Sequence, residues 1–271
     1  GEGIRNRTEP TPEAGASASS ASAEECRDPG KGLEKCSGSI NNDYWRYLLI
    51  IAIDGPAGSG KSTAAKGLAE RLGFTYLDSG AMYRAFTWKV SSSGADFSDK
   101  EGLCKLLADT SIRIECSADG SEVFVDDVDV TREIRHPSVT ENIHHISSLD
   151  FVRKKMVELQ RDFARGKDII AEGRDMCSVV FPDADKKIYM DADVKERAKR
   201  RHSELQAFDD EGSSIDNVIE DIAQRDHRDS TRQFAPLKRE PDALYLDTTS
   251  LEAEDVVNLL IKEIQKEQQR N

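Results

Sequence analysis

Cysteine is scarce in this sequence, and its spacing does not suit a metal site. The chain of 271 residues has five cysteines, five histidines and no Cys-x-x-Cys pair. Structural zinc needs closely spaced thiolate and imidazole ligands, and a disulfide-stapled domain needs a denser framework. We therefore expect free thiols in a reducing compartment.

Positive charge and long apolar runs are also in short supply. The formal net charge is -13, and no apolar run approaches the length of a membrane span. Binding to duplex nucleic acid requires a positive surface. We therefore expect neither nucleic acid nor a membrane as a partner. A chain this acidic that binds anions must concentrate its positive charge locally.

Large apolar residues are almost absent before Tyr44. Residues 14–23 are all Ala, Ser or Gly, and acidic residues are frequent throughout the first 46 positions. Such a segment cannot bury enough apolar surface to offset its ordering entropy. We predict that residues 1–46 form a disordered tail. Because transit peptides are poor in acidic residues, the tail is better interpreted as a linker left after processing.

The rest of the chain is organised around one stretch that starts at Leu48. An apolar run ends in a glycine-rich turn and is followed by a helical pattern, and the turn reads Gly55-Pro56-Ala57-Gly58-Ser59-Gly60-Lys61-Ser62-Thr63. Its spacing, G-x-x-x-x-G-K-S, is that of a phosphate-binding loop. The glycines let the backbone approach a polyphosphate and point N–H groups at it. Lys61 would serve the β and γ phosphates of ATP, and Ser62 would offer a hydroxyl to Mg²⁺.

Beyond this loop the periodicity alternates between strands and helices, which is typical of an α/β fold. Residues 111–116 and 122–125 alternate in polarity around an Asp-Gly turn and predict a β-hairpin. The hairpin falls within an insert at about 95–145. Two helical patterns follow at about 194–228.

Arginines gather at the predicted carboxyl ends of strands. Arg84 follows the second strand and Arg174 follows the third, while Arg225, Arg228 and Arg232 lie in the stretch 225–232, after two predicted helices. Ligands of open parallel sheets bind at this edge, and the guanidinium fork suits phosphate oxygens. An isolated surface arginine is usually only a solvated charge. Several of them around one phosphate loop indicate a second anion site.

Two signatures of other phosphate-handling proteins are missing. The chain has no Asn-Lys-x-Asp stretch for guanine recognition and no protein-kinase catalytic loop. Ser79, Arg153 and Asp175 instead offer donors and acceptors to a base or sugar.

From about Leu48 to its end, the chain resembles bacterial-type cytidylate kinases. The resemblance is carried by the phosphate loop and by residues 77–84, 172–176, 179–184 and 225–237. It implies a three-layer P-loop NTPase fold with a five-stranded parallel sheet in residues 47–271. It also implies a β-rich monophosphate-binding insert at 95–145 and a helical lid at 194–228.

The resemblance implies a role for each matching residue. The cytosine contacts would be Ser79, Arg153 and Asp175, with Tyr83 beside the substrate. The CMP phosphate would be held by Arg84, Arg174 and Arg232, and the ribose by Arg225 and Asp229. Glu172 would hold waters of the Mg²⁺. Positive charge in the transition state would come from Lys61, Arg174, Arg197, Arg200 and Arg201.

Three features depart from the family pattern. His144 stands near the sugar, where the family usually has a small hydroxyl residue, and Cys177-Ser178 replaces a common Gly-Thr. The long tail, together with a bacterial-type core, suggests a plastid form of the enzyme. We therefore expect a monomer in the chloroplast stroma, with the cytoplasm as the alternative.

The resemblance implies an enzyme that transfers the γ-phosphoryl group of ATP to CMP or dCMP. Two other hypotheses remain open. One is a kinase for another small acceptor such as AMP, UMP or shikimate. The other is a nucleotide-dependent switch, which would need no second nucleotide site.

Overall fold

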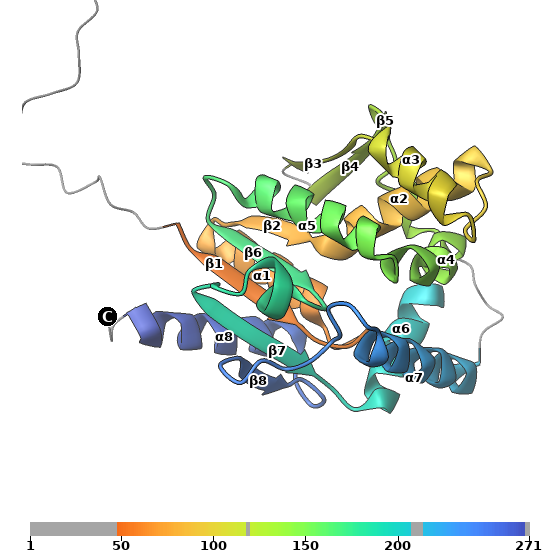
Figure 1. Cartoon of the computed structure of the whole chain (residues 1–271). Coiled ribbons are helices and arrows are strands. Elements are labelled where there is room, and N and C mark those ends of the chain that lie inside the picture. The colour runs from red at the N-terminus through yellow and green to blue at the C-terminus, as the bar shows by residue number, and fades with distance from the viewer. Residues whose placement is uncertain (1–47, 118–119, 207–213, 269–271) are drawn as a thin grey trace, which may run out of the picture. The chain divides into compact units, whose positions relative to one another are not determined.

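The computed structural model, shown in Figure 1, describes residues 48–117, 120–206 and 214–268. The predicted disordered tail lies outside the described residues. Among those that are described, no helix is both long and apolar enough to cross a bilayer.

A five-stranded parallel sheet forms the centre of the fold, as predicted. Its order is β2-β6-β1-β7-β8, and each pair of neighbours runs parallel. The strands are β1 (Ile50–Asp54), β2 (Thr75–Asp78), β6 (Ile169–Gly173), β7 (Lys186–Asp191) and β8 (Leu244–Asp247). Because all five run the same way, the loops after β1, β2 and β6 meet at one edge of the sheet.

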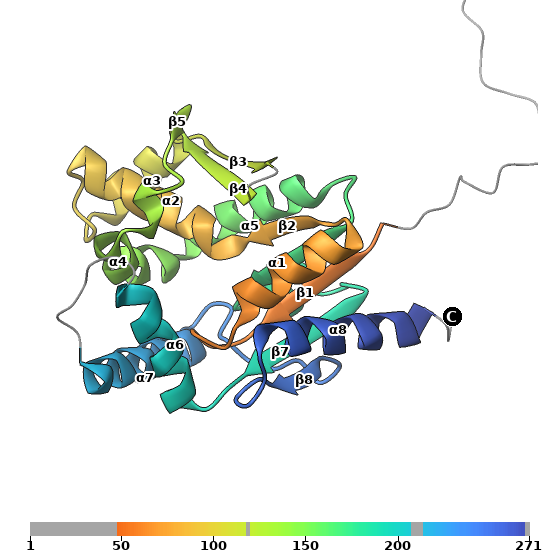
Figure 2. The same cartoon turned by 180° about the vertical axis from the view of Figure 1, so that it is seen from behind.

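Helices cover both faces of the sheet and make three layers. On one face lie α1 (Lys61–Leu72) and α8 (Ala253–Gln268), side by side in Figure 2. They pack on Ile51, Ile53 and Ile170 of the strands. On the other face lie α2 (Ser79–Ser93) and α5 (Asp150–Ala164), whose core includes Ala52 and Ala171. Neighbouring residues of β1 therefore face opposite layers, as the strand periodicity requires.

The insert between α2 and α5 has its own sheet. The predicted hairpin is confirmed, because β3 (Ile112–Ser117) and β4 (Gly120–Val125) pair antiparallel. A short third strand, β5 (Val128–Asp129), pairs with β4. Helical segments complete the region, namely α3 (Lys100–Ala108), the 3₁₀ turn η1 (Glu133–Arg135) and α4 (Pro137–Ser147). The sequence analysis did not foresee α4.

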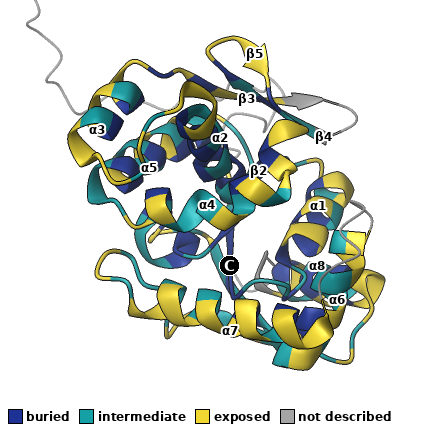
Figure 3. Cartoon of the chain, turned by 90° about the vertical axis from the view of Figure 1, so that its right-hand side faces the viewer, coloured by how far each residue is buried: buried dark blue, intermediate teal, exposed yellow. Residues whose placement is uncertain are grey.

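The two helices predicted for the lid region are present. They are α6 (Val194–Gln206) and α7 (Ile215–Thr231), which pack together through Ala198, Val218 and Ile222. This small core is separate from the two cores that flank the main sheet. Figure 3 shows α6 and α7 as a pair whose outer surfaces are largely exposed. These two helices are therefore a small packing unit attached after β7.

Candidate active site

The phosphate loop joins β1 to α1, and its glycines are required by geometry. Gly58 and Gly60 have φ of 76° and 84°, in the left-handed region that favours glycine. A Cβ at Gly55 would lie 2.0 Å from the backbone oxygen of Met190. The loop therefore passes too close to the end of β7 for any side chain at Gly55. Gly60 caps the N-terminus of α1, where anions are favoured.

Lys61 is folded back into this loop. It is 4% exposed, and its Nζ donates to the Pro56 carbonyl at 2.6 Å and to Ser59 Oγ at 3.3 Å. Burial, together with the positive charge of Arg174, lowers the pKa of Lys61 to about 7. Anionic phosphates beside the ammonium would relieve both effects. Two loop positions remain. The Ala57 carbonyl accepts a hydrogen bond from α6, and Thr63 has an exposed side chain on the first turn of α1.

Ser62 and Glu172 meet at the start of α1. The Ser62 Oγ donates to Glu172 Oε1 at 2.5 Å, although 110 residues separate them in the chain. Glu172 lies at the end of β6, next to β1 in the sheet. A hydroxyl and a carboxylate oxygen are ligands that Mg²⁺ prefers, with water and phosphate completing the shell. These two groups therefore fit the metal that the sequence predicts.

The residues predicted to contact the base lie together on the side of the sheet that α2 and α5 cover. The guanidinium of Arg153 forms a buried ion pair with Asp175 and donates to the Ser147 carbonyl at 3.2 Å. It also lies over the Tyr83 ring, 5.5 Å from the centroid. The Ser79 Oγ donates to the Glu172 carbonyl at 2.7 Å, which ties the start of α2 to the end of β6.

Asp229 of α7 joins the lid to the sheet edge. Its carboxylate accepts from Arg174 Nε at 2.9 Å and lies 3.7 Å from Arg232 Nη1. Burial alone would raise the pKa of Asp229, but Arg174, Arg225 and Arg232 outweigh it and hold the pKa below its usual value. The carboxylate is therefore ionised at neutral pH, and it helps to keep these guanidinium groups together.

Arg225 lies at the centre of the positive charge. Burial and the neighbouring Arg174 lower its pKa to about 10, with smaller effects from Arg201 and Arg84. Its guanidinium forms no hydrogen bond or ion pair with any residue of the described ranges. A cation in such surroundings is costly unless an anion joins it. The arrangement of Arg225 among other cations is therefore suited to binding phosphate.

Two further donors are left over nearby. Arg84 Nε and Arg232 Nη2 are buried and have no hydrogen-bond partner. One other nitrogen of each residue is engaged, because Arg84 Nη2 donates to Asp78 at 2.7 Å and Arg232 Nε donates to the Ala235 carbonyl at 2.6 Å. Arg232 Nη2 also lies 3.8 Å from Asp175 Oδ1, which is an ion-pair distance and not a hydrogen bond. Buried polar groups are normally satisfied. Orphaned donors on two arginines therefore indicate an absent anionic or polar ligand.

The three arginines of α6 have different surroundings. Arg197 is 7% exposed, and its Nη1 donates to Asp226 at 2.6 Å and to the Ala57 carbonyl at 3.1 Å. Arg200 Nη2 donates to the Thr248 carbonyl at 2.7 Å. Arg201 pairs with Glu204 at 3.0 Å and is more exposed than Arg197. All three thus have protein acceptors, and the positive charge of Arg201 is among those that lower the pKa of Arg225.

The two side chains that depart from the family pattern occupy different places. The His144 Nδ1 lies 2.7 Å from the Glu141 carbonyl, and the ring contacts that of His145 with centroids 3.9 Å apart. Burial lowers the pKa of His144, and the nearby Arg228 of the lid contributes. Cys177 is buried beneath the site, and its Sγ lies 3.4 Å from the Ala52 carbonyl.

Sequence reasoning missed several residues that hold the site in place. Tyr76 contacts Glu172, and Asp78 contacts Arg84. Asp226 and Thr248 accept hydrogen bonds from arginines of α6. Asp54 is completely buried and accepts from the backbone amides that follow Asp175. The position of Asp54 and Asp78 at strand ends was the one signal that could have identified them.

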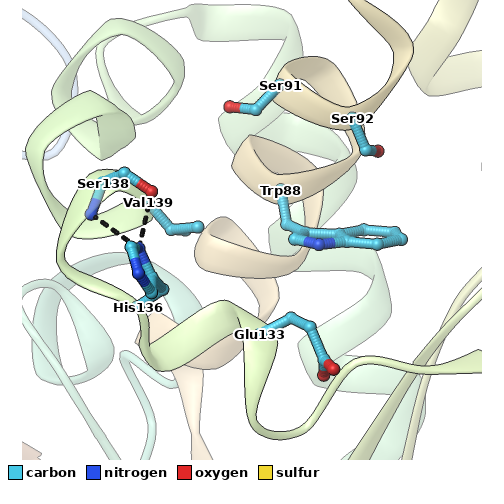
Figure 4. Close-up of a pocket in the computed structure, with 7 residues that line it drawn as sticks. All are labelled: Trp88, Ser91, Ser92, Glu133, His136, Ser138 and Val139. Carbon is cyan, nitrogen blue, oxygen red and sulfur yellow. Dashed lines mark hydrogen bonds between the residues drawn. The ribbon is translucent and has the colours of Figure 1, made fainter. Parts of the chain in front are cut away.

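The hollow in Figure 4 is a different place. It has a volume of about 330 Å³, and its lining comes from α2, η1 and the first residues of α4, namely Trp88, Ser91, Ser92, Glu133, His136, Ser138 and Val139. No predicted site residue is among them. With a carboxylate and no Arg or Lys in its lining, it does not suit a phosphate.

The five-stranded parallel sheet and the phosphate loop before α1, with several arginines at the same edge of the sheet, define a protein of the P-loop class. The family model for cytidylate kinase matches residues 51–266. The chain belongs to the cytidylate kinase family.

Individual relatives agree with this assignment. A cytidylate kinase of Chloroherpeton thalassium is 46% identical over 215 residues, covering 77% of this chain and 90% of the relative. A cytidylate kinase of Geobacillus kaustophilus is 44% identical, covering 79% and 95%. In Prochlorococcus marinus the match is 44% identical and covers 41% of a bifunctional pantoate ligase/cytidylate kinase.

A shikimate kinase structure from Bacteroides thetaiotaomicron is 13% identical to this chain, with a TM-score of 0.41. It covers 81% of this chain and 99% of its own. A likeness this slight has no bearing on the activity.

Proposed function

We propose that the protein transfers the γ-phosphoryl group of ATP to CMP or dCMP, giving ADP and CDP or dCDP. One observation supports this above the others. Around the phosphate loop, Arg84, Arg225 and Arg232 have hydrogen-bonding capacity that the described protein does not fill. A switch protein needs no such second anion site.

The chemistry requires little beyond placement and charge. The attacking oxygen of a nucleoside monophosphate is already anionic, so no strong general base is needed. The barrier comes from bringing two anions together and from charge spread over the transferred group. One arginine aimed at that charge is worth roughly 10³–10⁵ in rate. Among the arginines of α6, Arg201 suits this task, with Lys61 on the donor side.

We assign the acceptor nucleotide to the connected group around Asp175. Arg153, Asp175 and Ser79 would contact the cytosine, with Tyr83 packed beside them. The monophosphate would lie between Arg84, Arg174 and Arg232, and the ribose near Asp229 and Arg225. Arg197 would act indirectly, because its bonds to Ala57 and Asp226 join the phosphate loop to the lid.

The metal would be held by Ser62 and, through water, by Glu172. Their 2.5 Å hydrogen bond places a hydroxyl and a carboxylate at the start of α1, beside the loop that binds phosphate. When bound, Mg²⁺ neutralises charge on the phosphates. The protein residues contribute the oxygen ligands and keep them next to Lys61.

A panel of acceptors tests the function. We expect ATP-dependent turnover of CMP and dCMP in a coupled assay, and much slower turnover of AMP and shikimate, because we assign the Arg153–Asp175 pair to the edge of a cytosine ring, which is smaller than adenine and which shikimate lacks. The rate with UMP tests how strongly that pair discriminates cytosine from uracil. Equal rates with AMP would refute the assignment. ATP binding without any CMP binding would favour the switch.

We also propose the chloroplast stroma as the location, and a monomer as the state in solution. The location is supported by a bacterial-type core combined with the acidic segment 1–46, which lies before the family match that begins at residue 51. A fluorescent fusion of the natural full-length protein in plant cells would test it, with cytoplasmic fluorescence as the contrary outcome. Light scattering of the purified chain would test the state.

A further inference from the structure

Tyr76 of β2 reaches the same carboxylate oxygen that Ser62 does. Its hydroxyl donates to Glu172 Oε1 at 3.0 Å, while the Ser62 Oγ donates to that oxygen at 2.5 Å. The sheet register explains the contact. Tyr76 pairs with Ile170 on the adjacent β6, so Glu172 is its diagonal neighbour on the face covered by α1.

The two donors leave the other carboxylate oxygen available. No described residue donates to Glu172 Oε2. A serine hydroxyl has one proton and two lone pairs, so Ser62 can ligate a metal through oxygen and still donate its proton. Tyr76 supplies a second anchor that does not depend on the metal. Its ring is held below α1, with Lys66 Nζ 5.7 Å from the centroid.

The hydrogen bond from the Tyr76 hydroxyl to the Glu172 carboxylate is charge-assisted, which makes it stronger than a neutral one.

We propose that Tyr76 is a positioning residue for the metal: its hydroxyl fixes Glu172 Oε1 and so holds the carboxylate in the orientation in which it would bind waters of Mg²⁺. This inference rests on the proposed metal role of Ser62 and Glu172. Tyr76 itself touches neither substrate nor metal. Partners of this kind typically change metal affinity by 10- to 100-fold when they are removed.

The substitution Tyr76→Phe removes the hydroxyl and keeps the ring. We expect the Mg²⁺ concentration needed for half-maximal turnover to rise roughly tenfold, with most of the rate recovered at saturating Mg²⁺. The matched control is Tyr245→Phe, because Tyr245 is an exposed tyrosine on β8 that is stacked on Tyr189. The control should leave the Mg²⁺ requirement unchanged.

A binding measurement separates this inference from the proposed function. Mn²⁺ titration of the enzyme–ADP complex, followed by electron paramagnetic resonance, needs no CMP turnover. We expect a roughly tenfold weaker Mn²⁺ affinity for Tyr76→Phe than for the wild type. An unchanged affinity would overturn the inference, whatever the outcome of the acceptor panel. If the enzyme does not phosphorylate CMP but the Mn²⁺ affinity of Tyr76→Phe falls as expected, only the proposed function is overturned.

A second variant excludes a general structural effect. If Tyr76 acts through the carboxylate, adding Tyr76→Phe to Glu172→Gln should leave the already weakened Mn²⁺ affinity as it is. A further tenfold loss in the double variant would show that Tyr76 acts by another route, and would contradict the inference. Urea denaturation of each variant shows whether the fold is retained, since a phenylalanine fills the same space.

Discussion

Asp54 links the donor and acceptor halves of the site, and its replacement gives a prediction with a calculable size. The side chain is 0% exposed, and it accepts from the amides of Met176 at 2.9 Å and Cys177 at 2.8 Å. These amides open the π-helical turn η2 (Met176–Val180), directly after Asp175. The strand that leads into the phosphate loop thus holds the turn beside the predicted cytosine contact.

Burial raises the pKa of Asp54 from 3.8 to about 6. A folded-state pKa above the unfolded value means that the folded protein binds the proton more tightly. The stability contributed by this group is therefore greatest at low pH and is lost as the pH rises from about 4 to about 6. Between pH 4.5 and pH 7.5 the loss amounts to about 2 kcal/mol.

The variant Asp54→Asn has no charge to bury, so its free energy of unfolding should lack this pH-dependent loss. It should also lose about 1–3 kcal/mol at every pH, because an amide NH₂ then faces a backbone N–H. Urea denaturation of both proteins at the two pH values measures the difference, and the titration of all other groups cancels. We expect the variant to gain about 2 kcal/mol relative to the wild type on going to pH 7.5. Parallel pH profiles would refute the reasoning.

Four further substitutions test the assigned roles. Lys61→Ala should stay folded and lose nearly all turnover, because the phosphate loop loses its ammonium; wild-type-like turnover in an ATP/CMP coupled assay would remove Lys61 from the chemistry. Arg174→Ala should raise the KM for CMP far more than that for ATP, and equal rises would move Arg174 out of the acceptor half. Arg197→Ala should lower the free energy of unfolding by about 3 kcal/mol in urea denaturation, because it leaves the Asp226 carboxylate without its cation. Arg201→Ala should lower it by less than about 1 kcal/mol. Similar losses in the two variants would contradict the linking role of Arg197.

The sequence analysis was accurate where the signals are local. The phosphate loop is a contiguous motif whose glycines are fixed by backbone geometry, and the hairpin follows from alternation around an Asp-Gly turn. Arg84 and Arg174 follow predicted strands, so a parallel sheet brings them to one edge without further knowledge. These features need only neighbours in the chain.

The features that were missed depend on which strands and helices become neighbours. Tyr76 contacts Glu172 only because β2 lies next to β6, and Asp226 reaches Arg197 only because α6 packs on α7. The helix α4 was missed for another reason. Its Ser, Thr, Asn and His residues are weak helix formers, and Val139 and Ile146 are its only fully buried residues. Pro137 at its first turn was the available signal.

The central claim is that one electropositive site holds a donor triphosphate and a pyrimidine monophosphate end to end and passes a phosphoryl group directly between them. The most direct measurement is phosphorus NMR of the reaction of CMP with ATP that carries oxygen-18 in its γ-phosphoryl group. We predict that the isotope shift appears on the β-phosphorus of CDP. Label found in inorganic phosphate, with no labelled CDP, would contradict the account.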